Sequence, residues 1–184
     1  MESNPMTADP NSLRLEDYLR DVPDFPKPGI VFKDITPLLA SPEAFRVAVE
    51  RLTEAVRHLR PTHIAAIESR GFLFGTPMAE RLKASIIPLR KPGKLPWKTI
   101  EESYNLEYGS NTLEVHVDGA GPSDRVVLVD DLLATGGTAC ASVNLIRRLG
   151  AEVVASVFAV ELDFLRGRDL LHGMEVISLV HVDG

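Results

Sequence analysis

Short runs of branched apolar residues alternate along this chain with segments whose apolar residues recur at helical spacing. The apolar runs that predict strands are HIAAI (63–67), SIIPL (85–89), RVVLV (125–129), EVVASVFAV (152–160) and MEVISLV (174–180). Continuous apolar runs are typical of strands buried on both faces, and their alternation with helices favours a parallel sheet. The order of elements therefore predicts an α/β fold, with helices on both faces of a mostly parallel, twisted sheet.

The helices between these strands have recognisable start and stop signals. Residues 42–59 are predicted to form a helix, because Ser41 suits the N-cap and Pro42 suits the first helical position. Further helices are expected at 72–83 and from about Thr138 to the stop at Gly150.

Two shorter elements are expected outside this alternation. Residues 13–20 are predicted to form a short amphipathic helix, and LEYGSNTLEVHV (106–117) a hairpin with its turn near Gly109–Asn111.

The length of 184 residues, without an internal linker or repeat, predicts one domain. We expect residues 1–12 to form a disordered tail and residues 13–184 to form the domain. Within it, a hood is expected at about 21–40 and a flexible loop at about 90–112.

Charge and composition disfavour several classes of function. The net charge of −6 argues against a nucleic-acid-binding surface, which is usually basic. The single cysteine, Cys140, suits a reducing compartment, and no apolar run approaches the roughly 20 residues that span a membrane. Because the first residues also lack the pattern of a signal peptide, we expect a cytoplasmic protein without a membrane partner.

The segment VVLVDDLLATGGTA (126–139) places small and hydroxylated residues directly after a buried strand. Glycines allow tight turns and close approach to a ligand, and the start of the next helix offers unpaired N–H groups. These features predict a phosphate cradle made of Ala134, Thr135, Gly136, Gly137 and Thr138. The sequence contains neither GxxxxGK[ST] nor GxGxxG, which disfavours nucleotide hydrolysis and dinucleotide binding.

Asp130 and Asp131 stand immediately before this cradle. Carboxylates repel a phosphate but accept hydrogen bonds from vicinal hydroxyls, as an acidic residue does for a ribose. The pair therefore favours a sugar phosphate as ligand. The alternative is a solvated strand end followed by a flexible turn.

The same segment resembles the phosphoribosyl-diphosphate signature of the type I phosphoribosyltransferases. Five further motifs of that family precede this segment in the chain, in the family's order. They are DFPKPGIVFKDITPLL (24–39), ESRGFLFG (68–75), RKPGKLP (90–96), YNLEYG (104–109) and LEVH (113–116). The resemblance covers nearly the whole chain from about residue 21, and DDLLATGGTA has the form found in adenine-specific members.

The resemblance implies transfer of a 5-phosphoribosyl group from 5-phospho-α-D-ribose 1-diphosphate to adenine, yielding AMP and diphosphate in purine salvage. It also implies a homodimer and Mg²⁺ held mainly through the phosphoribosyl diphosphate, with no metal ligand from the protein. Two rivals are a relative that uses oxopurines or another base, and a regulator that binds nucleic acid. The regulator lacks room for a DNA-binding module before residue 21.

The resemblance assigns the diphosphate to two segments. ESRGF (68–72) follows a strand and opens a helix, so Ser69 and Arg70 would hold diphosphate, across a cis peptide after Glu68. Arg90, Lys91 and Lys94 would add positive charge, with Arg90 reaching a neighbouring subunit. The alternatives are that Arg70 pairs with a carboxylate, and that RKPGKLP is a solvated surface loop.

The base and the acid are assigned to two other segments. Val31 and Lys33 would offer backbone groups to the adenine edge, and Phe32 a ring for stacking, although by composition alone Phe32 is a core residue. Ala134 stands where many oxopurine relatives carry an acidic aspartate, so Glu107 is the candidate to assist at N7 of the purine. The alternative is that Glu107 pairs with a loop lysine and holds the loop shut.

Overall fold

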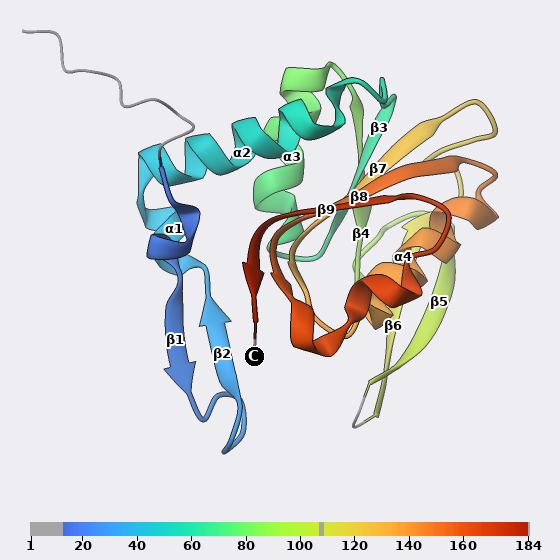
Figure 1. The fold of residues 1–184 in the computed structure, drawn as a ribbon. Coiled ribbons are helices and arrows are strands. Elements are labelled where there is room, and N and C mark those ends of the chain that lie inside the picture. The colour runs from blue at the N-terminus through green and yellow to red at the C-terminus, as the bar shows by residue number, and fades with distance from the viewer. Residues whose placement is uncertain (1–12, 107–108, 184) are drawn as a thin grey trace, which may run out of the picture. The chain divides into compact units, whose positions relative to one another are not determined.

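The computed structural model describes residues 13–106 and 109–183 (Figure 1). The contacts divide the chain into two compact units, one up to Glu50 and one from Arg51 to Gly184. The predicted tail, 1–12, lies outside the described residues. Of the helices among the residues described, none is long and apolar enough to cross a membrane.

The first unit contains a two-stranded antiparallel ribbon and the start of a long helix. Its elements are the 3₁₀ turn η1 (Leu15–Tyr18), β1 (Arg20–Pro23), β2 (Val31–Asp34), α1 (Thr36–Ala40) and α2 (Pro42–Arg57). Ser41 Oγ accepts a hydrogen bond from the N–H of Ala44 at 3.2 Å, which confirms the predicted N-cap of α2.

The prediction of a helix over 13–20 was wrong. Helical geometry is limited to η1, and Arg20 already begins β1, where it pairs with Asp34 of β2. A hydrogen bond and ion pair between the Arg20 and Asp34 side chains, at 2.5 Å, reinforces this register. The partner strand lies more than ten residues away, so the local periodicity of residues 13–20 did not reveal it.

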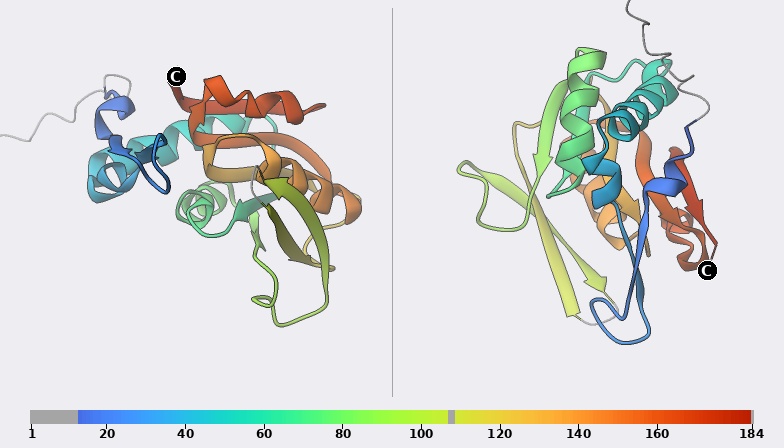
Figure 2. Two further views of the ribbon diagram at one scale, coloured as in Figure 1. Left: turned by 90° about the horizontal axis from the view of Figure 1, so that it is seen from below. Right: turned by 90° about the vertical axis from the view of Figure 1, so that its left-hand side faces the viewer.

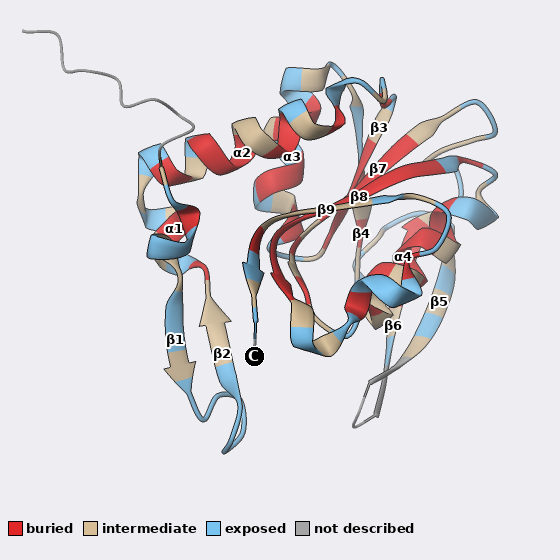
Figure 3. Cartoon of the chain, in the orientation of Figure 1, coloured by how far each residue is buried: buried red, intermediate tan, exposed pale blue. Residues whose placement is uncertain are grey.

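The second unit is built on a five-stranded sheet in the order β4-β3-β7-β8-β9. All its strand pairs are parallel, which confirms the predicted parallel sheet. The strands are β3 (His63–Ile67), β4 (Ser85–Leu89), β7 (Arg125–Leu133), β8 (Glu152–Leu162) and β9 (Glu175–Val182). The helices are α3 (Gly71–Leu82) and α4 (Gly137–Arg148), and the 3₁₀ turns η2 (Asp163–Leu165) and η3 (Gly167–Leu170) join β8 to β9. Figure 3 shows buried positions concentrated along β3, β7 and β8.

The order of the strands explains how helices cover both faces. From β3 through α3 the chain moves to β4, whereas from β7 through α4 it moves in the opposite direction to β8. Because such crossovers are right-handed, opposite directions place α3 and α4 on opposite faces of the sheet. Figure 2 gives two further views of these layers.

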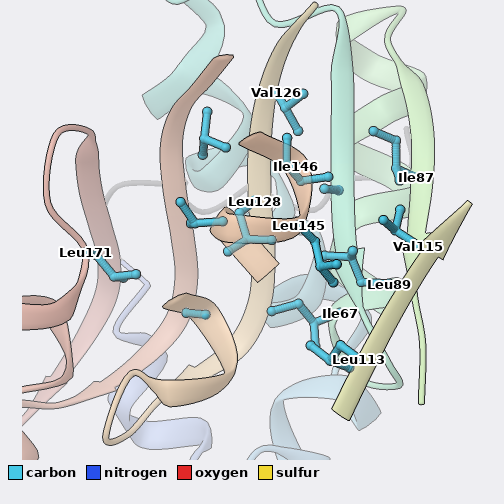
Figure 4. Packing of buried hydrophobic residues seen from close by; sticks show 14 of the residues in the cluster. Ile67, Ile87, Leu89, Leu113, Val115, Val126, Leu128, Leu145, Ile146 and Leu171 are labelled. Carbon is cyan, nitrogen blue, oxygen red and sulfur yellow. The ribbon is translucent and has the colours of Figure 1, made fainter. Parts of the chain in front are cut away.

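The core beneath α4 joins the sheet to a second ribbon. Leu145 and Ile146 of α4 belong to one buried cluster with Leu128 of β7, Ile67 of β3 and Leu113 of β6 (Gly109–His116) (Figure 4). Burial of each such side chain contributes about 1.5–3 kcal/mol. This packing fixes where α4 begins, and therefore where the glycine-rich loop before it lies.

The second ribbon consists of β5 (Thr99–Leu106) and β6 (Gly109–His116). The register pairs Leu106 with Gly109 and Tyr104 with Asn111, so the predicted turn at Gly109–Asn111 was wrong. Residues 107 and 108, between the two strands, lie outside the described residues. Much of the segment expected to be a flexible loop (90–112) is thus paired strand. The apolar run of β6 was recognised, but its partner is the polar sequence of β5, which has no strand pattern of its own.

Candidate active site

The candidate site lies between β3 and β7, where the chain connections to the neighbouring strands leave in opposite directions. Adjacent parallel strands whose helices leave toward opposite faces open a crevice at their carboxyl ends, the usual ligand site of such sheets. A cavity of about 290 Å³ is found here. Its lining residues are Ile67, Glu68, Ser69, Arg70, Lys91, Tyr104, Asp130, Asp131 and Thr138. Segments that the sequence only predicted to meet therefore line one cavity.

The glycine-rich loop forms a smaller hollow of about 70 Å³, lined by Asp130 and residues 132–139. Gly136 has a φ of +82°, a conformation that side chains other than glycine rarely adopt, and it directly precedes α4. The first N–H groups of a helix have no partner within the helix and carry its partial positive charge. All five residues predicted for the phosphate cradle line this hollow, which is suited in size and polarity to a single phosphate group.

The paired aspartates belong to β7 itself, because the strand continues to Leu133, beyond the predicted end at residue 129. Asp131 is only 4% exposed, so a solvated strand end is excluded for it. Arg70 Nε donates to Oδ2 of Asp131 at 2.5 Å, and the N–H of Asp131 donates to Oδ1 of Asp130 at 2.9 Å. The weighed alternative, in which Arg70 pairs with a carboxylate, is therefore seen in this structure.

The two carboxyl groups are in different electrostatic situations. Burial, and then the charge of Asp131, raise the pKa of Asp130 well above its usual value, and Arg70 offsets this only in part. Asp131 forms an ion pair with the Arg70 guanidinium. Asp130 thus favours a ligand that supplies hydroxyl donors or positive charge.

Glu68 organises the positive side of the cavity. Its carboxylate accepts hydrogen bonds from Arg90 Nε at 3.2 Å, Lys94 Nζ at 2.5 Å and the N–H of Lys91 at 3.0 Å. Burial would raise the pKa of Glu68, but these hydrogen bonds outweigh it and hold the pKa below its usual value. The predicted cis peptide between Glu68 and Ser69 is present.

These contacts place the predicted diphosphate residues around the same cavity. Ser69, Arg70 and Lys91 line it, whereas Arg90 and Lys94 are joined to it through Glu68. Arg90 also lies over the Phe72 ring, with its guanidinium carbon 5.9 Å from the centroid. RKPGKLP is therefore tied to the cavity at three of its positions and is not simply a solvated loop.

Two polar lining residues, Glu68 and Tyr104, were not predicted from the sequence. Glu68 belongs to the ESRGF motif but was considered only for its peptide bond. Tyr104 of β5 accepts a hydrogen bond from Thr138 Oγ1 at 3.1 Å, which links the second ribbon to the start of α4. Tyr104 stands in YNLEYG, a motif already recognised, so its aromatic hydroxyl was the available signal.

The residues predicted to bind the base lie in the first unit. Val31 is 49% exposed, and the Phe32 ring meets Phe25 edge to face with centroids 5.3 Å apart. Lys33 Nζ pairs with Asp21 at 2.6 Å across the ribbon. Phe32 is half-buried rather than a core residue. Glu107, the predicted acid, lies outside the described residues.

A parallel sheet with a phosphate loop after one strand and a cationic loop after its neighbour defines a class of α/β proteins that bind phosphorylated sugars. Residues 35–170 match the family model described as the phosphoribosyl transferase domain. An adenine phosphoribosyltransferase of Carboxydothermus hydrogenoformans is 60% identical over 166 residues, covering 90% of this chain and 98% of the relative.

Solved structures are similar over the same extent. The crystal structure of adenine phosphoribosyltransferase from Thermoanaerobacter pseudethanolicus has a TM-score of 0.88 and 49% identity, over 92% of this chain and 100% of that one. The enzyme from Saccharomyces cerevisiae, complexed with D-2,5-dideoxy-2,5-imino-altritol 1,6-bisphosphate and adenine, has a TM-score of 0.84 and 37% identity, over 90% and 96%. This chain belongs to the phosphoribosyltransferase family and, within it, to the adenine phosphoribosyltransferases.

Proposed function

We propose that the chain transfers the 5-phosphoribosyl group from 5-phospho-α-D-ribose 1-diphosphate to adenine, giving AMP and diphosphate in purine salvage. The observation that carries this proposal is the cavity shared by the phosphate loop, the aspartate pair and the ESRGF loop. It offers separate surroundings for a phosphate, a ribose diol and a diphosphate. The Saccharomyces cerevisiae relative was solved in complex with D-2,5-dideoxy-2,5-imino-altritol 1,6-bisphosphate and adenine, which supports adenine as a substrate here.

The sugar phosphate is proposed to lie along β7. Its 5-phosphate would accept hydrogen bonds from the backbone and hydroxyls of residues 134–138, and its diol would donate to Asp130 and Asp131. Both contacts bind groups of the substrate, the 5-phosphate and the diol, that are not changed in the reaction. They orient C1′ toward the attacking base, and such positioning supplies much of the rate enhancement in group transfer.

The diphosphate is proposed to lie over Ser69, Arg70 and Lys91, with Arg90 and Lys94 nearby. As N9 of adenine attacks C1′, the bond to diphosphate breaks through an oxocarbenium-like transition state. Negative charge then grows on the leaving oxygens, and fixed cations stabilise it most at that point. In the ligand-free chain Glu68 and Asp131 hold these cations, so bound diphosphate would compete with both carboxylates.

Mg²⁺ is proposed to bind mainly through oxygens of the phosphoribosyl diphosphate. Of the described carboxylates that line the cavity, Glu68 and Asp131 already form ion pairs. Such a donor set suits an ion that keeps several waters and binds through substrate phosphates and at most one or two carboxylates. When bound, the ion supplies positive charge that offsets the charge of the leaving diphosphate.

Adenine recognition by Val31, Phe32 and Lys33, assistance at N7 by Glu107, and a homodimer that shares Arg90 belong to the same proposal. Backbone groups on β2 provide both a donor and an acceptor, which suits an amino-purine edge. We also propose a cytoplasmic location, in keeping with the single cysteine. The rival that uses oxopurines predicts a different preference among bases, and the nucleic-acid regulator predicts no turnover.

The decisive experiment is a base-panel assay with phosphoribosyl diphosphate and Mg²⁺. We expect kcat/KM for adenine to exceed that for hypoxanthine and guanine by about 10⁴-fold, because a 6-oxo base leaves buried polar groups unpaired. Comparable values for hypoxanthine would contradict adenine specificity. A gel shift with nucleic acid and no turnover with any base would support the regulator.

A further inference from the structure

The phosphate loop is backed by a chain segment some thirty residues further along. Gly167 begins η3, in the connection between β8 and β9, and it is buried. A Cβ at Gly167 would overlap the carbonyl oxygen of Ala134 and lie 2.9 Å from the N atom of Gly136. Conversely, a Cβ at Gly136 would overlap the carbonyl oxygen of Gly167. The two backbones are therefore in direct contact, with no space for a side chain on either.

An ion pair between Arg168, whose side chain is 45% exposed, and the buried Glu161 holds this segment to the sheet. Arg168 Nε and Nη2 donate to the two carboxylate oxygens of Glu161, each at 2.7 Å, and Ser178 Oγ of β9 donates to Oε2 at 2.7 Å. Glu161 is only 1% exposed and lies opposite Leu133, the last residue of β7. The forked pair thus ties the backbone next to Gly167 to the strand that neighbours the phosphate loop.

We infer that Glu161, Gly167 and Arg168 are positioning residues that set the conformation of the phosphate loop for the 5-phosphate of the substrate. This inference rests on the proposed function, because it assigns a role within the same site. An ion pair with one exposed partner contributes little net stability, whereas a forked guanidinium–carboxylate pair fixes geometry well. None of the three residues lines the cavity, so they act through the backbone of residues 134–136.

Two parts of the substrate should depend on different loops. Ribose 5-phosphate depends on the loop that Gly167 supports, whereas inorganic diphosphate depends on the ESRGF loop after β3. A displacement of the phosphate loop should therefore weaken the first ligand and spare the second. General destabilisation of the fold would affect both.

The test is calorimetric titration of the folded chain with ribose 5-phosphate and, separately, with inorganic diphosphate and Mg²⁺. For Gly167→Ala we expect the Kd of ribose 5-phosphate to rise about 10- to 100-fold, as for other remote changes that misplace binding groups, with diphosphate binding unchanged. The matched control is Gly121→Ala, because the only atom near a Cβ at Gly121 is Oδ2 of Asp124, at 3.9 Å. This control should bind both ligands as the unsubstituted chain does.

A second pair of variants tests the ion pair and decides the matter if Gly167→Ala does not fold. Arg168→Lys keeps the charge but cannot form the fork, so ribose 5-phosphate should bind more weakly and diphosphate equally well. Its control is Arg166→Lys, since among the described residues Arg166 forms its ion pair with Asp169, within the same segment. Unchanged binding of ribose 5-phosphate in Gly167→Ala or Arg168→Lys, or an equal loss of both ligands, would overturn the inference.

Failure of the proposed function would be seen elsewhere. Turnover with adenine is measured on the unsubstituted chain, and its absence contradicts the proposed function whatever the variants do. The positioning inference is tested only by the ratio of the two dissociation constants.

Discussion

Replacing Asp130 by asparagine should stabilise the ligand-free chain and at the same time weaken its binding of phosphoribosyl diphosphate. Burial and the neighbouring Asp131 raise the pKa of Asp130 in the folded chain. A carboxyl whose pKa is raised on folding stabilises the fold fully below its unfolded pKa, and that stability is lost as the pH rises through the folded pKa. At neutral pH, folding must either bury a charge or take up a proton. Asparagine needs neither, and its carbonyl oxygen can still accept from the N–H of Asp131.

Asp131→Asn is the matched comparison and should have the opposite effect on stability. Asp131 is buried and accepts a hydrogen bond from Arg70, whose side chain is 45% exposed. Hydrogen bonds to charged groups contribute about 1.5–3 kcal/mol. Because water can still reach Arg70, the loss should lie at the lower end, about 1.5 kcal/mol in the free energy of unfolding. In both variants the ribose diol loses a charged acceptor, which should raise the KM for phosphoribosyl diphosphate about 10- to 150-fold.

Urea denaturation of the ligand-free chains at neutral pH measures the free energy of unfolding, and steady-state kinetics with adenine and Mg²⁺ measures KM. The stability gained by Asp130→Asn should shrink as the pH falls toward 3.8, the ordinary pKa of an aspartate. The reasoning fails if Asp130→Asn unfolds more easily than the unsubstituted chain at neutral pH. It also fails if KM is unchanged in both variants, because the ribose diol would then not bind at Asp130 and Asp131.

Three further predictions concern other parts of the chain. If Arg90 serves a neighbouring subunit, Arg90→Ala mixed with an Asp130→Asn, Asp131→Asn chain should regain activity, and inactive verified mixed dimers would argue against sharing. Glu107→Gln should slow the chemical step about 10²- to 10⁴-fold in single turnover at saturating substrate. Weaker substrate binding with an unchanged chemical step would instead indicate that Glu107 pairs with a loop lysine and holds the loop shut. Hydrogen bonds from Thr36, with help from Arg20, lower the pKa of Asp34 to about 2, so it stabilises the fold above its ordinary pKa of 3.8. The loss of thermal stability in Asp34→Asn should therefore fade between about pH 4 and pH 2, and a pH-independent loss would be evidence against this.

Some elements could be predicted because their signals are local. The alternation of apolar runs with helical segments was sufficient for the parallel sheet, and Ser41 before Pro42 was sufficient for the start of α2. The glycine-rich loop was predicted because tight backbone geometry restricts which residues a position accepts. At Gly136 the structure shows this restriction directly, since its φ is +82°.

Other features depend on partners that no local pattern reveals. The helix predicted over 13–20 is limited to the 3₁₀ turn η1 because Arg20 begins β1, and the turn of the second ribbon was placed incorrectly. Pairing between separate segments decides both. The ion pair between Arg70 and Asp131 joins residues 61 positions apart. The sequence offered a carboxylate partner for Arg70 as an alternative, but it did not indicate that Asp131 is that partner.

The sequence alone determined the alternation of strands and helices in the parallel sheet, the chemical character of its loops and the family to which the chain belongs. These depend on residue type and on spacing within a few turns of chain. Only the tertiary structure decided that Asp130 lies half-buried beside a second carboxylate, that Glu68 accepts from three nitrogen donors, and that the backbone of Gly167 contacts the glycine-rich loop. The physical reason is that burial, electrostatic coupling and backbone contact depend on distances across the fold, which are set when separate strands and helices pack together.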